Sequence, residues 1–288
     1  MSGLRSAARM NCCSPRIVAV ALGLCALWPA TAAAQTPAGP ETAPSAGSTA
    51  PPARLDPTKV VAASNPDPLE LLESAGDEIK LSDETQTTRW SHAQSNAKIH
   101  LTPQVSSRAV ARLRFFTEDG LPEVYPVLAA RQDSGGRVWL QIRVPKRPNG
   151  TTGWVLDEMV SSFYIVRTLL VIDRGKLRAT LFKRGKQIWS ARVGIGKSAT
   201  PTPAGQFWIR ERLKGLGSGG TYGPWAFGTS AYSNLSDWPG GGVVGIHGTN
   251  QPSLIPGRPS HGCVRVRNDK IRALARLMPI GTPVNIIN

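Results

Sequence analysis

Short runs of alternating apolar and polar residues fill the C-terminal part of the chain. Three of them, LLVID, LRATLFK and QIWSARVGIG, follow one another over residues 169–173, 177–183 and 187–196, with Arg-Gly-Lys turns between them. Period-two alternation between turn residues is typical of antiparallel strands. Strands do not alternate with helices here, and the pattern therefore predicts a mostly antiparallel β-sandwich rather than a doubly wound sheet.

Helical spacing is clear near the C-terminus, in DKIRALARLM over residues 269–278. Asn268 stands where it can cap the N-terminus of this helix, and Pro279 follows its last residue. The fold expected for residues 164–288 is thus a β-sandwich with one short C-terminal helix, and the whole chain is expected to be mostly β.

A second group of short strands is predicted over residues 88–161. RVWLQIRV, residues 137–144, alternates between turn signals at residues 133–136 and 148–150. The stretch WLQIRVPKRPNGTTGWV, residues 139–155, resembles the closing strands of bacterial SH3-like wall-targeting domains. We therefore expect a small SH3-like β domain here, with a β-rich spacer that has no ligand as the alternative.

The first 34 residues have the features of a secretory signal peptide. Three arginines precede an apolar run over residues 17–28, and Ala-Ala-Ala at residues 32–34 offers a cleavage site before Gln35. The run is shorter than the about 20 residues that a membrane-spanning helix needs. We expect export to the periplasm, or to the cell wall or extracellular face.

Residues 35–87 are predicted to comprise a disordered Pro/Ala/Thr-rich linker and an acidic segment, in which LELLESAGDEIKL, residues 69–81, can form a short helix. The part up to about residue 58 is rich in Pro, Ala, Thr and Ser, and it has too few aliphatic residues to bury a core. The acidic segment, residues 67–84, shows no recognisable chemistry.

Positive charge is concentrated in the second predicted domain of a chain whose net charge is +15. Residues 164–288 hold 18 Lys and Arg against 4 Asp and Glu, a net charge of +14, whereas residues 59–163 hold 12 against 13, a net charge of −1. An anionic wall polymer or a membrane surface is the expected partner, with a merely solvated basic surface as the alternative. No nucleic acid is expected, because the chain has no nucleic-acid-binding motif.

The cysteines point to one candidate nucleophile. Three of the four lie before residue 35, so the exported chain is expected to keep only Cys263. A lone cysteine in an exported protein is a free reactive thiol or forms an intermolecular bridge. The alternative is a structural role, in which the buried cysteine acts as a small hydrophobic residue. His261 and Arg265 favour a thiolate, since nearby positive charge lowers the pKa of a thiol.

Acyl transfer by a thiol also needs a base and donors for an oxyanion. Two histidines compete for the role of base. His261 lies two residues from Cys263 and would point to the same face of a strand. His247 comes from a separate segment and can approach the sulfur from across the site.

The residues around these side chains resemble a known signature. His247-Gly248, followed by SHGCVR at residues 260–265, is similar to the active-site motif of the L,D-transpeptidases of bacterial cell walls, the YkuD-type catalytic domain. PTPAG, residues 201–205, resembles the proline-glycine turn of that family, and the similarity covers about residues 169–287. The interval between the two histidines is at the short end of the family's range, which leaves the shape of the loop over the site open.

The resemblance implies a role for each residue of the motif. It makes Cys263 the nucleophile and His247 its base. It then assigns the other residues to the pocket and to substrate binding: the Gly248 carbonyl orients the His247 ring, Ser260 and His261 shape the pocket, the N–H groups of Gly262 and of the cysteine stabilise the oxyanion, and Arg265 binds a substrate carboxylate or forms a structural ion pair.

The resemblance also implies the reaction. The thiolate attacks the third residue of a donor tetrapeptide stem of peptidoglycan and expels the terminal D-alanine. A diamino-acid side chain of a second stem then resolves the thioester to give a 3→3 cross-link, or a partner is attached to the stem. No cofactor and no metal are expected, and a carbapenem should acylate the same sulfur.

Three alternatives remain open at this point. His247, His261 and Cys263 could hold a catalytic zinc ion with a water molecule. A sortase-like cysteine acyltransferase or hydrolase of the cell wall uses similar residues. The third alternative is a catalytically silent wall-binding protein.

The cleavage site before Gln35 leads to the first testable prediction. The mature chain is expected to begin at Gln35 and to contain one titratable thiol, because the other three cysteines leave with the signal peptide. Intact mass spectrometry of the secreted protein, with and without a thiol reagent, measures both. A retained or lipid-modified Cys25 would contradict the prediction.

Overall fold

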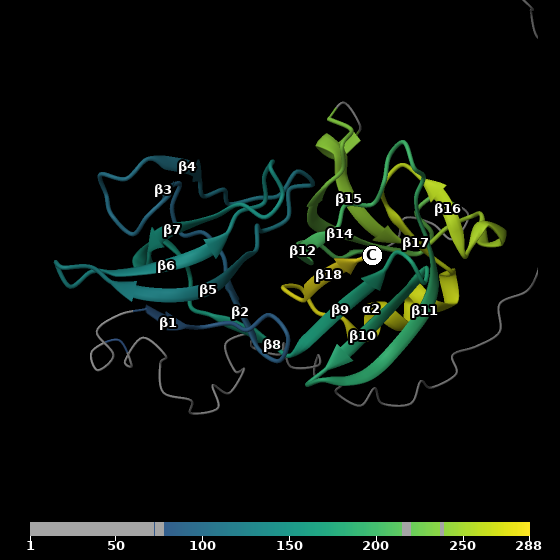
Figure 1. Ribbon diagram of the computed structural model, residues 1–288, viewed down its shortest axis with the longest axis horizontal. Helices are drawn as coiled ribbons and strands as arrows, with labels where there is room; N and C mark the ends of the chain where they lie inside the picture. The colour runs from purple at the N-terminus through teal and green to yellow at the C-terminus, as the bar shows by residue number, and fades with distance from the viewer. Residues whose placement is uncertain (1–71, 73–77, 215–219, 237–238) are drawn as a thin grey trace, which may run out of the picture. The chain divides into compact units, whose positions relative to one another are not determined.

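The computed structural model describes residue 72 and residues 78–214, 220–236 and 239–288 (Figure 1). All of them belong to one compact unit, Val61–Asn288. The predicted signal peptide and all but one residue of 35–77 lie outside the described residues. Within the described part of the chain, no helix is both long and apolar enough to cross a membrane.

The first eight strands form one antiparallel sheet. Its order is β4-β3-β7-β6-β5-β2-β8, and β1 pairs with β5. The strands are β1 (Glu78–Lys80), β2 (Thr88–Ser91), β3 (Lys98–His100), β4 (Ala109–Arg112), β5 (Tyr125–Gln132), β6 (Val138–Arg143), β7 (Thr152–Leu156) and β8 (Tyr164–Val166), with a short 3₁₀ helix η2 (Asp157–Met159) after β7. The predicted strand at residues 137–144 corresponds to β6.

The first sheet extends beyond the predicted range of residues 88–161 at both ends. At its start, β1 pairs with β5 and the Leu81 side chain is buried in the core of this sheet. The end of the acidic segment therefore forms a strand of the first sheet, where a short helix was predicted. At its end, β8 pairs with β2, although residue 164 was predicted to open the next domain. Strands of three residues carry too little alternation to be found without their partners. The SH3-like interpretation stays a prediction.

The remaining strands form a second, mixed sheet with the order β12-β18-β9-β10-β11-β17-β15-β14-β13, and β16 pairs with β11. Its elements are β9 (Thr168–Asp173), β10 (Arg178–Lys183), β11 (Lys186–Gly196), β12 (Gly205–Trp208), β13 (Leu213–Lys214), β14 (Trp225–Tyr232), η3 (Pro239–Gly242), β15 (Val243–His247), η4 (Pro252–Leu254), β16 (Gly257–Ser260), β17 (Val264–Val266), α2 (Asn268–Leu277) and β18 (Pro283–Ile287). The three strands predicted over residues 169–196 are β9, β10 and β11.

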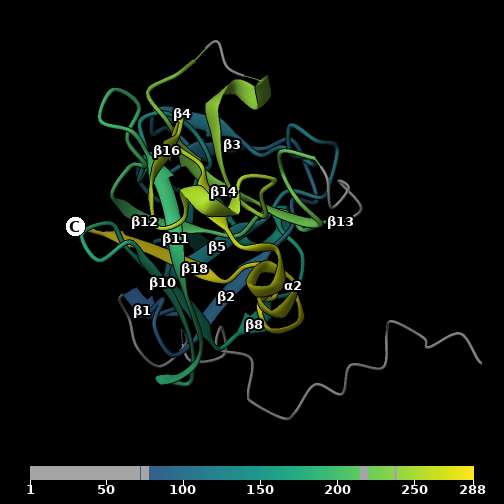
Figure 2. The same cartoon turned by 90° about the vertical axis from the view of Figure 1, so that its right-hand side faces the viewer.

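The long strand β11 joins the two halves of this sheet. Its first part pairs with β10, and its last residues pair with β16 and β17. Side chains from both halves meet in one hydrophobic core, as in a β-sandwich, and Ile271, Leu274 and Ala275 of α2 complete it (Figure 2). The prediction of a mostly β fold with a C-terminal helix is confirmed. Three strand pairs are parallel, namely β9–β18, β11–β16 and β15–β17.

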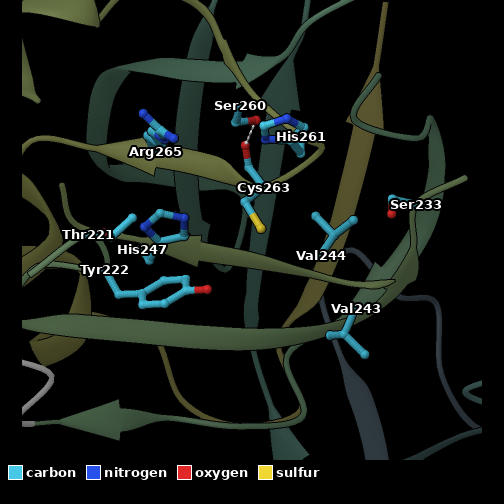
Figure 3. Close-up of a pocket in the computed structure, with 10 residues that line it drawn as sticks. All are labelled: Thr221, Tyr222, Ser233, Val243, Val244, His247, Ser260, His261, Cys263 and Arg265. Atoms are coloured by element: carbon cyan, nitrogen blue, oxygen red, sulfur yellow. Dashed lines mark hydrogen bonds between the residues drawn. The ribbon is translucent and has the colours of Figure 1, made fainter. Parts of the chain in front are cut away.

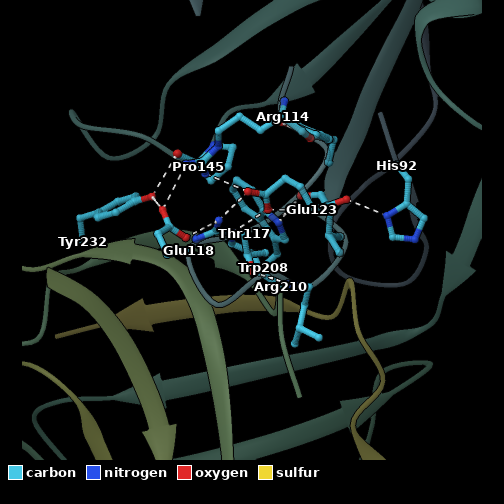
Figure 4. A network of polar contacts seen from close by, with 12 residues as sticks. His92, Arg114, Thr117, Glu118, Glu123, Pro145, Trp208, Arg210 and Tyr232 are labelled. Carbon is cyan, nitrogen blue, oxygen red and sulfur yellow. Dashed lines mark hydrogen bonds and ion pairs between the residues drawn. The ribbon is translucent and has the colours of Figure 1, made fainter. Parts of the chain in front are cut away.

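A buried ion pair joins the two sheets (Figure 4). Arg210, which follows β12, donates from Nε to Glu123 Oε1 at 2.7 Å and from Nη2 to Glu123 Oε2 at 2.5 Å, and both side chains are almost fully buried. The same Nη2 lies 2.8 Å from Glu118 Oε2. Burial by itself lowers the pKa of Arg210, but the hydrogen bonds and charge of Glu123 outweigh it, and the pKa is raised.

Removal of one charge from this pair tests its contribution to stability. Glu123→Gln should lower the free energy of unfolding by up to about 3–5 kcal/mol, because buried Arg210 would keep only the partly exposed Glu118 as its counter-charge. Urea denaturation followed by circular dichroism measures the loss. Glu78→Gln, on exposed β1, is the matched control and should change stability by about 0.5 kcal/mol or less. Equal stabilities of the two variants would show that the pair does not hold the sheets together.

Candidate active site

The parallel pairing of β15 with β17 brings the two predicted catalytic residues together. Ile246 pairs with Val264 and His247 with Arg265, so the next pair along the strands is Gly245 with Cys263. Side chains alternate between the faces of a sheet. Ile246 and Val264 point into the core and are 1% and 0% exposed. His247, Cys263 and Arg265 therefore share the opposite face.

A pocket opens on this face (Figure 3). Its lining comes from the residues before β14, from the residue that follows β14, from β15, and from the stretch that runs from the end of β16 into β17. The lining residues are Thr221, Tyr222, Ser233, Val243, Val244, His247, Ser260, His261, Cys263 and Arg265. Five predicted site residues are thus brought to one pocket, and the other two, Gly248 and Gly262, adjoin His247 and Cys263 in the chain.

The hydrogen bond of His247 fixes which ring nitrogen carries the proton. Its Nδ1 lies 2.6 Å from the Gly248 carbonyl oxygen, which can only accept, so Nδ1 bears the hydrogen. Nε2 is left with a free lone pair, the form that a general base needs. The edge of the Tyr222 ring packs against the imidazole with centroids 4.9 Å apart.

His247 is neutral at physiological pH. Its side chain is buried, and its pKa is lowered to about 4. Burial is the largest cause and the positive charge of Arg265 adds to it, whereas the hydrogen bond to Gly248 raises the pKa. A neutral imidazole can take a proton from a thiol, whereas an imidazolium cannot.

Cys263 does not carry the lowered pKa that its neighbours suggested. Burial raises the pKa of its thiol, and this effect outweighs the hydrogen bond from the Gly245 N–H to Sγ, at 3.4 Å, and the charge of Arg265. The expectation of a resting thiolate is therefore wrong. Basic neighbours were visible in the sequence, but the burial that opposes them was not.

Gly245 is a site residue that the sequence reasoning missed. Besides its N–H contact with the sulfur, it leaves open the space between the two catalytic side chains. A Cβ at this position would lie 3.7 Å from His247 Cδ2 and 3.9 Å from Cys263 Sγ. The one signal in the sequence is a glycine two residues before His247 in an otherwise apolar strand.

The nucleophile sits at the end of a turn tied by Ser260. The Ser260 hydroxyl donates to the Cys263 carbonyl at 2.5 Å and accepts from the Gly262 N–H at 3.2 Å. Gly262 has φ +126°, a conformation that favours glycine. Of the two N–H groups expected to bind an oxyanion, that of Gly262 is thus already engaged within the turn.

Thr202 explains why the proline-rich turn at residues 201–205 belongs to the site. Its hydroxyl accepts from the Gly196 N–H at 2.9 Å and donates to the Gly262 carbonyl at 2.7 Å. The turn therefore links the end of β11 to the residue before the nucleophile. Thr202 is 1% exposed, so this link is shielded from water.

His261 and Arg265 occupy the polar side of the pocket. His261 Nε2 lies 3.2 Å from Lys197 Nζ, and because an ammonium group only donates, Nε2 accepts. Arg265 donates from Nη1 to Gln251 Oε1 at 2.9 Å. Its Nε is buried and has no hydrogen-bond partner among the described residues.

The donor set does not favour the zinc alternative. Across residues 78–214, 220–236 and 239–288, no three His, Cys, Asp or Glu side chains come together in a way that could hold a metal ion. In the pocket, His261 Nε2 is bonded to Lys197, which leaves His247 and Cys263 as the accessible pair.

Comparisons with known proteins all point to L,D-transpeptidases. Residues 167–286 match the family model of the YkuD L,D-transpeptidase catalytic domain. The L,D-transpeptidase YkuD of Bacillus subtilis (strain 168) is 30% identical over 123 residues, which cover 43% of this chain and 68% of that protein. The L,D-transpeptidase YbiS of Escherichia coli (strain K12) is 48% identical over 48 residues, 17% of this chain and 16% of that protein.

Solved structures add little to these matches. A crystal structure of a mutant Enterococcus faecium L,D-transpeptidase is 25% identical, covers 42% of this chain and 49% of that chain, and overlays with a TM-score of 0.33. The chain spans 57% of the corresponding Bacillus licheniformis protein and about half of the Enterococcus faecium chain.

The raised thiol pKa can be measured directly. The rate of Cys263 alkylation by iodoacetamide should still be rising with pH at pH 9, because only the thiolate reacts and burial raises the pKa of this thiol. Mass spectrometry of the peptide that contains Cys263 gives the rate between pH 6 and pH 10. The same protein in urea is the control, and its rate should level off near the ordinary thiol pKa of about 8.5. A plateau below pH 8 in the folded protein would indicate a resting ion pair with His247.

Proposed function

We infer the function from the family: the chain belongs to the L,D-transpeptidases that carry a YkuD catalytic domain. We propose that it transfers acyl groups between peptidoglycan stem peptides through a thioester on Cys263. The observation that carries the proposal is the placement of Cys263 and of a neutral, Nδ1-protonated His247 on one face of the β15–β17 pair. The donor is a tetrapeptide stem and the acceptor is a diamino-acid amine, so that the product is a 3→3 cross-link.

The first half-reaction forms the acyl-enzyme. Cys263 Sγ attacks the carbonyl carbon of the third donor residue while His247 Nε2 takes the thiol proton. The tetrahedral intermediate then collapses, the C–N bond to the terminal D-alanine breaks, and His247 returns the proton to the departing amine. The thioester and free D-alanine are the products.

The second half-reaction resolves the thioester. The side-chain amine of a second stem attacks the thioester carbonyl, and His247 Nε2 takes a proton from the attacking nitrogen. The C–S bond breaks, the amide forms, and the proton returns to the sulfur. The residues of the site account for each proton transfer, and the proposed reaction uses no cofactor.

The timing of proton transfer follows from the two pKa values. The thiol pKa is raised and that of His247 is about 4, so a resting thiolate–imidazolium pair is disfavoured. The proton therefore moves as the C–S bond forms. Substrate binding also displaces water from the pocket, which strengthens the N–H and Arg265 contacts with the developing charge.

The surroundings of the site support an anionic substrate. Arg265 lines the pocket with Cys263, and its guanidinium can bind a stem-peptide carboxylate. The high positive charge of the second domain fits an anionic wall polymer or membrane surface. Export to the periplasm or cell wall, and wall targeting by the SH3-like domain, belong to the same proposal.

The assigned roles predict a graded series of variants. Cys263→Ala should abolish cross-linking, since no other thiol lies in the pocket. His247→Ala should reduce the rate about 10²-fold to 10⁴-fold, the usual contribution of a general base. His261→Ala should have a milder effect because it shapes the pocket. Mass spectrometry of wall fragments from strains that express each variant measures the 3→3 product, and an equal loss for both histidines would contradict the assignment.

A carbapenem adduct locates the nucleophile independently of the acceptor. Intact mass spectrometry should show one adduct on the wild type and none on Cys263→Ala. Activity should survive a chelator. Loss of activity with the chelator, or an adduct on the alanine variant, would move the chemistry away from Cys263. Release of D-alanine without a cross-link would indicate hydrolysis in place of transfer.

A further inference from the structure

The connection between β14 and β15 forms one wall of the pocket. Ser233 lies at its start and Val243 at its end, and both line the cavity (Figure 3). The Ser233 N–H donates to the Gly242 carbonyl at 2.9 Å and closes the base of the connection. Whatever holds this segment in place therefore also shapes the space beside Cys263.

The first sheet reaches this connection through the loop between β6 and β7. Arg147 on that loop donates from Nη1 to the Gly241 carbonyl at 3.0 Å. Its Nη2 donates to the carbonyls of Ser233, at 2.9 Å, and Leu235, at 3.3 Å. One planar guanidinium thus binds carbonyl groups from both ends of the connection, a geometry that a lysine ammonium reproduces only in part.

Asn149 on the same loop binds the last residue of β14 as a neighbouring strand would. Its Nδ2 donates to the Tyr232 carbonyl at 2.9 Å, and its Oδ1 accepts from the Tyr232 N–H at 3.0 Å. The Tyr232 hydroxyl lies 2.9 Å from Glu118 Oε1 and 3.2 Å from the Pro145 carbonyl (Figure 4). The first sheet therefore holds Tyr232 by both its backbone and its side chain.

The contact continues from this wall to the nucleophile. A Cβ added to Gly262 would lie 3.2 Å from Ser233 Cβ, so Ser233 packs directly on the residue before Cys263. Ser233 itself is buried, with 6% of its surface exposed. A shift of Ser233 would therefore alter the wall of the pocket beside Gly262.

We propose that Arg147 and Asn149 of the first sheet are positioning residues for the active site. They hold Ser233 and Leu235, which follow β14, and Gly241, which precedes β15, in the positions that shape the pocket for the donor peptide. The first sheet is thereby part of the catalytic unit as well as a candidate wall-binding module. Their effect on catalysis rests on the proposed function, whereas their effect on the connection does not.

Two variants and two controls in the full chain test the proposal through kinetics. In Arg147→Ala and Asn149→Ala, KM for the donor peptide should rise about tenfold while kcat changes less than about threefold, because only a fraction of the molecules keeps the binding-competent wall. Arg147→Lys should recover part of the loss. Arg131→Ala, an exposed arginine on β5 of the same sheet, should match the wild type.

The thermal midpoint separates positioning from folding. Arg147 is exposed, so its loss should leave the midpoint close to that of Arg131→Ala. A KM within twofold of the wild type in Arg147→Ala and Asn149→Ala would overturn the proposal. A loss of activity that follows the unfolded fraction would overturn it as well.

Amide hydrogen exchange tests the same contact without any activity. Exchange of the Ser233 N–H should become about tenfold faster in Arg147→Ala, and it should remain unchanged in Arg131→Ala. If Cys263→Ala keeps its activity, the proposed function fails while the exchange result can still stand. If Ser233 exchange is unaffected by Arg147→Ala, the positioning role fails and the proposed function is untouched.

Discussion

The register between the parallel strands β15 and β17 determines the active site. Ile246 and Val264 form a cross-strand pair that the hydrophobic core buries completely. Because side chains alternate along a strand, burial of this pair turns His247, Arg265 and Cys263 to the opposite face. A slip of one residue would direct either the histidine or the thiol into the core. The free energy of core packing thus maintains the geometry on which the chemistry depends.

Burial positions the catalytic pair and also sets its protonation. The same desolvation that orders His247 and Cys263 lowers the pKa of the imidazole and raises that of the thiol. Positive charge from Arg265 is too weak to restore the thiolate. Both groups therefore rest in their neutral forms, and in the proposed reaction the proton moves only as the sulfur attacks a carbonyl carbon.

Features that depend on local pattern were predictable, and features that depend on pairing were not. The alternation in β9 to β11 and the histidine and cysteine motifs can be read along the chain. The role of Gly245 can be recognised only once β15 is known to pair with β17, which sets Gly245 beside Cys263. The hydrogen bonds of Thr202 and Arg147 likewise join segments that are far apart in sequence. The short strands β1 and β8 became assignable only through their partners. The thiol pKa was misjudged because charge is visible in a sequence and burial is not.

The two sheets depend on each other more closely than two independently folding domains would. Arg210, from the second sheet, is buried against the first sheet, where Glu123 supplies its counter-charge. The Trp208 ring N–H also donates across the contact, to the Val124 carbonyl at 2.8 Å. Without the first sheet, this charge and this donor would lose their partners. Tyr232, Arg147 and Asn149 extend the contact to the wall of the pocket. The first sheet therefore reaches the wall of the pocket through contacts that lie beside those that stabilise the fold.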